Sequence, residues 1–135
     1  MKYISAPFHY QLAEPETFQL KHIRPASDIE TWYCTFTKDG KLTGKIGWAW
    51  DGASGPTWDT KNTKRASCCH DLLAKLMRDE LLLHRMWLWA DKEFNLILEE
   101  DGMWGFRRRY WIRGLGLVHG SYALPKNKRK LCEAP

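Results

Sequence analysis

His70 and Asp91 are the residues whose types and spacing best suit chemistry. Each lies in an apolar stripe whose members recur every three or four residues: Ala66, His70, Leu73 and Met77 in one, and Trp87, Asp91, Phe94 and Leu98 in the other. Such residues share one helix face. A short polar stretch joins the two stripes, so an antiparallel helix pair would bring His70 against Asp91. A histidine held by a buried carboxylate is a better base and can activate water.

Asp71 and Asp51 predict an oxygen-lined pocket beside this pair. Asp71 is rotated by ~100° from its helical neighbour His70, so it can face the loop that begins at Asp51. Two carboxylates with loop carbonyls at Gly52 and Gly55 would suit a hard cation such as calcium. The structural alternative is that His70 and Asp91 are a satisfied buried pair, while Asp51 and Asp71 only cap and turn the chain.

The elements that must position these residues predict an α+β fold, with a small antiparallel β-sheet packed on about three α-helices. Alternating residues on both sides of Asp39-Gly40 predict a hairpin at 31–50 with a two-residue turn. The expected elements are edge strands and loops at 1–30, strands at 31–37 and 42–50, a loop at 51–62, and helices at about 63–77, 83–100 and 106–119.

Length and composition indicate one globular domain. The 135 residues are 44% hydrophobic and 27% charged, which suits a single core. We expect one domain at 1–124 and a basic, disordered tail at 125–135. No signal peptide precedes the chain, and no run approaches the ~20 apolar residues of a membrane span. These features predict a soluble protein made in the cytoplasm.

The positive charge gathers near the C-terminus, and the formal net charge is +5. The basic aromatic patch consists of Arg107, Arg108, Arg109, Arg113 and Trp111. It is either a solvated helix face or a contact surface for an anionic lipid or another phosphate-bearing ligand. Nucleic acid ranks behind these partners, because the chain carries no recognised nucleic-acid motif.

The order of these motifs resembles a family of small bacteriophage and prophage proteins that is catalogued as a domain of unknown function. The resemblance covers residues 50–94 of the 135 and rests on three motifs: Asp51-Gly52-Ala53-Ser54, His70-Asp71-Leu72-Leu73 and Ala90-Asp91-Lys92-Glu93-Phe94. It implies a phage origin. It implies no particular activity.

More distantly, the same order is similar to the small phospholipase A₂ enzymes. That family has a glycine-containing calcium loop, a helix with Cys-Cys and then His-Asp, and an antiparallel helix whose aspartate holds the histidine. The resemblance implies a calcium loop at 52–55, His70 as the base, Asp71 as a calcium ligand and Asp91 as the orienting residue. The chain departs from the family at Ala74, where a tyrosine is usual, and it lacks the disulfide framework of the secreted enzymes.

Together these features predict a phage-encoded protein with a phospholipase A₂-like His-Asp site, a calcium-dependent esterase or lipid hydrolase in which His70 activates water. The alternative is a non-catalytic virion or tail component, or a protein that binds a host factor, in which His70 and Asp91 are a structural pair. Such a protein would act in the host cytoplasm or in the virion. Substrate, oligomeric state and stage of infection have no signal in the residues.

Overall fold

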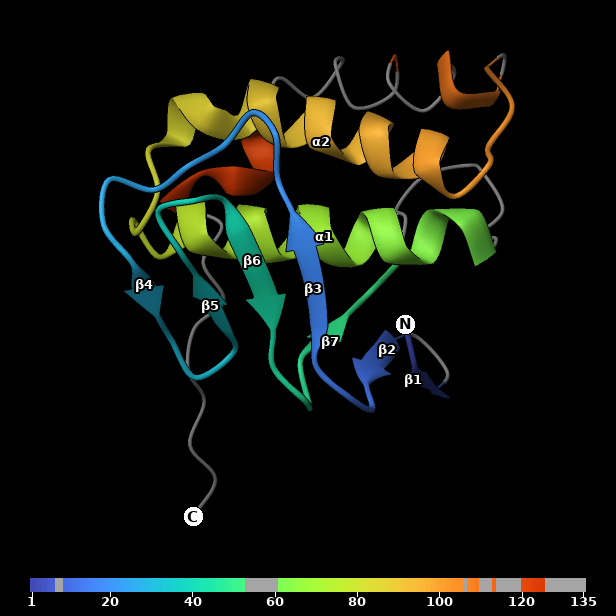
Figure 1. Ribbon diagram of the computed structural model, residues 1–135, viewed down its shortest axis with the longest axis horizontal. Helices are drawn as coiled ribbons and strands as arrows, with labels where there is room; N and C mark the ends of the chain where they lie inside the picture. The colour runs from blue at the N-terminus through green and yellow to red at the C-terminus, as the bar shows by residue number, and fades with distance from the viewer. Residues whose placement is uncertain (7–8, 53–60, 106, 110–112, 114–119, 126–135) are drawn as a thin grey trace.

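The computed structural model has the α+β architecture that the sequence predicts, with two small antiparallel sheets and a set of helices. It describes residues 1–6, 9–52, 61–105, 107–109, 113 and 120–125. Both sheets lie on one side of helix α1 (Lys61–Arg78), and helix α2 (Trp87–Glu100) lies on its other side (Figure 1). Helix α1 is therefore the central layer.

Seven short strands form the two sheets. They are β1 (Tyr3–Ala6), β2 (His9–Leu12), β3 (Glu16–Gln19), β4 (Ile29–Glu30), β5 (Cys34–Phe36), β6 (Lys41–Gly44) and β7 (Ala49–Trp50). One sheet has the order β1-β2-β7 and the other the order β3-β6-β5-β4, with antiparallel neighbours throughout. Phe18, Leu42 and Phe36 are cross-strand neighbours and are buried in one core with the apolar residues of α1.

The segment 31–50 forms a hairpin, but not two long strands. Strands β5 and β6 pair around a three-residue loop, closed where Thr37 N–H donates to the Lys41 carbonyl at 3.0 Å. The prediction of a two-residue turn is wrong, because only Gly40, with φ of 89°, has positive φ in this loop. The predicted strand at 42–50 is also interrupted. The chain turns at Gly47, with φ of 86°, and β7 then joins the other sheet beside β2.

Helix α1 ends in a turn that sends the chain back along it. Glu80 has φ of 59°, its N–H donates to the Met77 carbonyl, and the Leu81 N–H donates to the Leu76 carbonyl. This pattern is a Schellman-type helix end, with Glu80 in the position that usually takes glycine. A 3-10 turn, η1 (His84–Met86), leads into α2, so the start of the predicted 83–100 helix is not α-helical. The two long helices run antiparallel, side by side (Figure 1).

The predicted third helix at 106–119 lies mostly outside the described residues. Within that region Arg107, Arg108, Arg109 and Arg113 are helical. A second 3-10 turn, η2 (Ser121–Ala123), follows, and nearly all of the predicted tail lies outside the described residues. No helix in the described ranges is long and apolar enough to cross a membrane.

Glu93 of α2 fastens the N-terminal part of the chain to the helices. Its carboxylate is almost fully buried and accepts the backbone N–H groups of Lys21, at 2.7 Å, and His22. A buried carboxylate requires such donors. The flanking residues Leu20 and Ile23 are buried in the core. The segment 20–23 is thus fixed against α2, although Lys21 and Glu93 are 72 residues apart in the sequence.

One hydrogen bond holds β7 on α1, and a second, within α1, orients its acceptor. Trp50 Nε1 donates to Ser67 Oγ at 3.1 Å, and the Ser67 hydroxyl donates to the Lys64 carbonyl at 3.0 Å. Both Trp50 and Ser67 are buried. The strand that leads to Asp51 is therefore positioned against the helix that carries His70.

We expect Ser67→Ala to lower the free energy of unfolding by about 1–3 kcal/mol, because it leaves the buried indole N–H of Trp50 without an acceptor. Urea denaturation of the parent, both single variants and the Ser67→Ala/Trp50→Phe double variant measures the coupling. The cost of Ser67→Ala should be smaller when Trp50 is already phenylalanine. An equal cost in both backgrounds would show that this hydrogen bond does not contribute to stability.

Candidate functional site

The structure brings His70 and Asp91 together between α1 and α2. Nε2 of His70 lies 2.8 Å from Oδ1 of Asp91. Each residue is only 7% exposed, and the Phe94 ring packs edge-on against the imidazole with ring centroids 5.5 Å apart. The contact to Asp91 fixes the orientation of the imidazole. Its second nitrogen, Nδ1, lies 3.9 Å from Oδ1 of Asp71.

Two carboxylates keep His70 positively charged. Burial alone would disfavour the imidazolium, but the carboxylates of Asp71 and Asp91 outweigh it and raise the pKa of His70 to about 9. At neutral pH the imidazole therefore carries both protons. It must lose one of them before it can serve as a general base.

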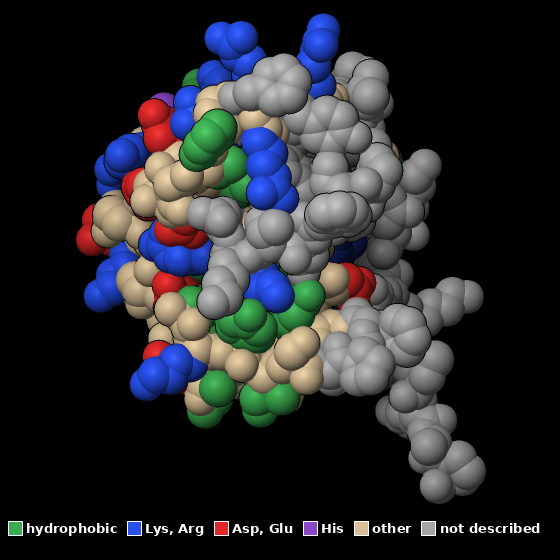
Figure 2. Space-filling model, turned by 90° about the vertical axis from the view of Figure 1, so that its right-hand side faces the viewer, with side chains coloured by type: hydrophobic (Ala, Val, Ile, Leu, Met, Phe, Trp, Pro, Cys, Tyr) green, Lys and Arg blue, Asp and Glu red, His purple; other side chains and the backbone are tan. Residues whose placement is uncertain are grey.

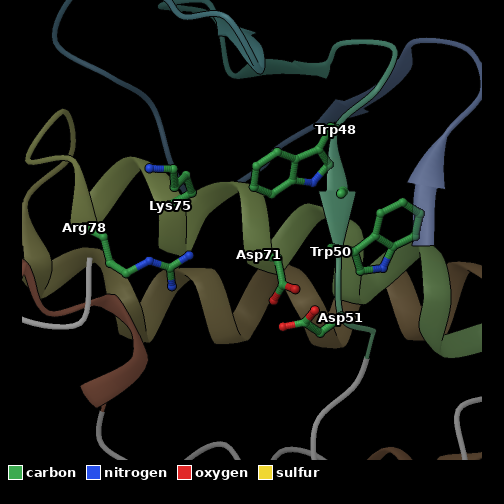
Figure 3. Close-up of a pocket in the computed structure, with 7 residues that line it drawn as sticks. Trp48, Trp50, Asp51, Asp71, Lys75 and Arg78 are labelled. Atoms are coloured by element: carbon green, nitrogen blue, oxygen red, sulfur yellow. The ribbon is translucent and has the colours of Figure 1, made fainter. Parts of the chain in front are cut away.

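A pocket of about 160 Å³ lies between the end of β7 and α1. It is lined by Trp48, Ala49, Trp50, Asp51, Asp71, Lys75 and Arg78. The carboxylates of Asp51 and Asp71 lie next to each other at one end of it (Figure 3). His70 does not line the pocket, but it is linked to it through Asp71. The dyad and the pocket thus lie on adjacent faces of one helix.

Asp51, Gly52 and Asp71 are the described part of the predicted calcium site. Burial raises the pKa of the Asp71 carboxyl, and the charge of Asp51 raises it further, whereas His70 and Arg78 lower it. Two adjacent carboxylates suit the oxygen donors that calcium takes. Gly52 follows Asp51 with φ of 83°, and the predicted ligand Gly55 lies outside the described residues. Across the described ranges no three or more His, Cys, Asp or Glu side chains converge as a metal site.

The predicted basic aromatic patch is only partly described. Arg108 lies 3.7 Å from a carboxylate oxygen of Glu99 on α2, and Arg109 and Arg113 are exposed. Trp111 lies outside the described residues. On the face drawn in Figure 2, the coloured Lys and Arg side chains are interspersed with Asp and Glu rather than forming one continuous basic area.

Three polar residues of the pocket are absent from the predicted site: Trp48, Lys75 and Arg78. Lys75 and Arg78 follow Asp71 by four and seven residues, so the helical period that placed His70 also places these side chains on the Asp71 face. The sequence therefore held a signal for them. Trp48 had no such signal, because its position depends on the turn before β7 and on the pairing of β7 with β2.

We expect Asp91→Ala to lower the free energy of unfolding by about 3–5 kcal/mol, because it leaves a buried imidazolium without its closest counter-charge. Asp91→Asn keeps an acceptor of the same shape and should cost less. Thermal and urea unfolding of both variants tests this order. Parent-like stability of Asp91→Ala would show that the pair does not join the helices.

The raised pKa of His70 also predicts how stability depends on pH. The folded pKa of about 9 exceeds the ordinary value of 6.5, so the stabilisation is fully present below 6.5 and is lost as the pH rises through about 9. We expect the difference in unfolding free energy between the parent and His70→Gln to shrink across this window in the absence of divalent cations. A pH-independent difference would contradict the charged pair.

Comparison of the chain with family models, with curated protein sequences and with solved structures finds no match in any of the three. The function is therefore argued from the site itself. Its parts are an oriented histidine between two carboxylates, and a neighbouring pocket with two carboxylates at one end.

Proposed function

We propose that this chain is a phage-encoded hydrolase of carboxylic esters in anionic, lipid-like substrates. His70 would activate water, Asp91 would orient His70, and Asp71 with Asp51 would hold a calcium ion, as in the phospholipase A₂ enzymes that the motif order resembles. The observation that carries the proposal is the 2.8 Å contact from Nε2 of His70 to Asp91, which leaves Nδ1 on the side of Asp71. The protein would act in the host cytoplasm or as part of the virion.

The chain's own residues would carry out the proton transfers. Neutral His70 would accept a proton from the water that attacks the ester carbonyl, and it would return a proton to the leaving alcohol, so that the products are a carboxylic acid and an alcohol. Asp91 would stabilise the imidazolium formed in between and hold its ring in place.

Asp71 with its bound calcium would assist the deprotonation of His70. Asp71 helps to raise the pKa of His70, so offsetting the charge of Asp71 would bring that pKa down and make the neutral base more abundant. The metal, when bound, would also polarise the ester carbonyl as a Lewis acid. Two adjacent carboxylates beside the histidine support this assignment (Figure 3).

A non-catalytic protein, either a virion or tail component or a binder of a host factor, is the second candidate. The observation that favours it is the burial of His70, which is 7% exposed and does not line the pocket. In this alternative the imidazolium and its two carboxylates only join the helices. The parent would then show no turnover at any calcium concentration.

We expect the parent to release fatty acid from phosphatidylglycerol vesicles in calcium, and His70→Gln to reduce the rate by ~10² to 10⁴, because general base catalysis supplies an effect of that size. Glutamine keeps a hydrogen-bonding side chain of similar reach, so thermal melts can show that the fold persists. Equal rates for the parent and His70→Gln would attribute the release to contamination.

The calcium assignment has its own control. Calorimetry should show calcium binding to the parent, and much weaker binding to Asp71→Asn, which keeps the shape but not the charge of the ligand. Equal heats for both proteins, or no heat for either, would remove the metal from the mechanism while leaving the His70–Asp91 pair in place.

A further inference from the structure

The pocket between β7 and α1 contains donors that the proposed hydrolysis does not use. The most informative is the indole N–H of Trp48. Trp48 is 7% exposed, and its Nε1 has no hydrogen-bond partner among the described residues. Buried polar groups are nearly always paired, so an unpaired donor beside a pocket indicates that an acceptor is missing.

Trp50 provides the contrast within the same pocket. Its Nε1 donates to Ser67 Oγ, so its hydrogen-bonding capacity is used inside the protein. Trp48 packs instead on Tyr33, with ring centroids 5.4 Å apart, and this contact holds the ring in place without satisfying its N–H. In Figure 3 the nitrogen-bearing edge of Trp48 faces the side where Asp71 lies. The unpaired donor lies at the wall of the pocket with almost no exposed surface, so the ring must shift slightly before an acceptor in the pocket can reach it.

The charges along α1 give the pocket a polarity. Asp71, Lys75 and Arg78 occupy one helix face, and Arg78 extends its guanidinium group back toward Asp71 (Figure 3). The ammonium group of Lys75 lies 2.8 Å from Asp79, which offsets its charge, so Arg78 is the main positive group of the pocket. Asp51 and Asp71 make the opposite end acidic. An anionic group would be repelled from that end and drawn toward Arg78.

The size of the pocket limits what can enter. A volume of about 160 Å³ is well below the ~300–1,000 Å³ of pockets that hold drug-sized ligands. A headgroup fits this space, whereas an acyl chain must remain outside. The pocket has donors on two sides, Trp48 before β7 and Arg78 on α1, which suits a group with several oxygens.

We propose that this pocket binds a phosphate group, with Trp48 Nε1 donating to one oxygen and Arg78 supplying the main positive charge. The phosphate can belong to a phospholipid headgroup or to a small soluble phosphate compound. The acidic end then accommodates a positive group on the same ligand or a bound cation. In the proposed function, this phosphate would be the group by which the protein recognises its substrate. Phosphate binding depends on Trp48 and the charges of α1, so it can occur even if no ester is hydrolysed.

The test is a titration of ¹⁵N-labelled protein with glycerol 3-phosphate, followed through the indole N–H signals. We expect the Trp48 signal to move downfield as its N–H gains an acceptor, while the Trp50 signal stays in place because its N–H already has one. Trp48→Phe should weaken binding roughly tenfold or more, and Trp104→Phe, the matched control at an exposed tryptophan that does not line the pocket, should not. If Trp48→Phe does not fold, Arg78→Gln provides the weakened variant.

Three outcomes decide the inference. An unmoved Trp48 signal at saturating glycerol 3-phosphate, or equal affinities for the parent and Trp48→Phe, would overturn it. His70→Gln should bind as the parent does, which separates phosphate binding from a failure of hydrolysis. The source of the phosphate is tested by competing the protein off phosphatidylglycerol vesicles with glycerol 3-phosphate. Protein that stays on the vesicles would identify the lipid as the source. Full displacement would identify a soluble phosphate compound.

Discussion

The contact between His70 and Asp91 is the interaction on which the arrangement of the site depends. It places an ion pair in an otherwise apolar helix interface, where each charge would be costly without the other. The pair therefore favours one register of α2 along α1, the register in which Asp91 meets Nε2 and Phe94 covers the ring. A shift of α2 by one helical turn would strand both charges.

The position of the pocket relative to the dyad depends on the angle between two consecutive residues of α1. His70 faces α2, and Asp71, about 100° further round, faces the end of β7. The hydrogen bond from Trp50 to Ser67 then sets the distance between that strand and the helix. Since the pocket is bounded by both elements, this contact helps to set its width.

The sequence predicted much of this site because its main parts are helical and local. The three-to-four residue spacing placed His70 and Asp91 on facing stripes, and the same period contained Lys75 and Arg78. The sheet was harder to predict. Residues 42–50 alternate as one strand would, but the positive φ of Gly47 breaks the run, and the pairing of β7 with β2 joins segments that are far apart in sequence. The pocket wall at Trp48 depends on that pairing, which local patterns do not report.

Glu93 connects this geometry to the order in which the protein folds. His70 and Asp91 are 21 residues apart, whereas Glu93 accepts the N–H of Lys21 across 72 residues. Closing the longer loop costs about 1 kcal/mol more in chain entropy, so the helix hairpin can form first. During synthesis from the N-terminus, the segment that contains Lys21 leaves the ribosome long before α2 does. The segment 20–23 must therefore wait, with the N–H groups of Lys21 and His22 still solvated, for the helix that carries Glu93.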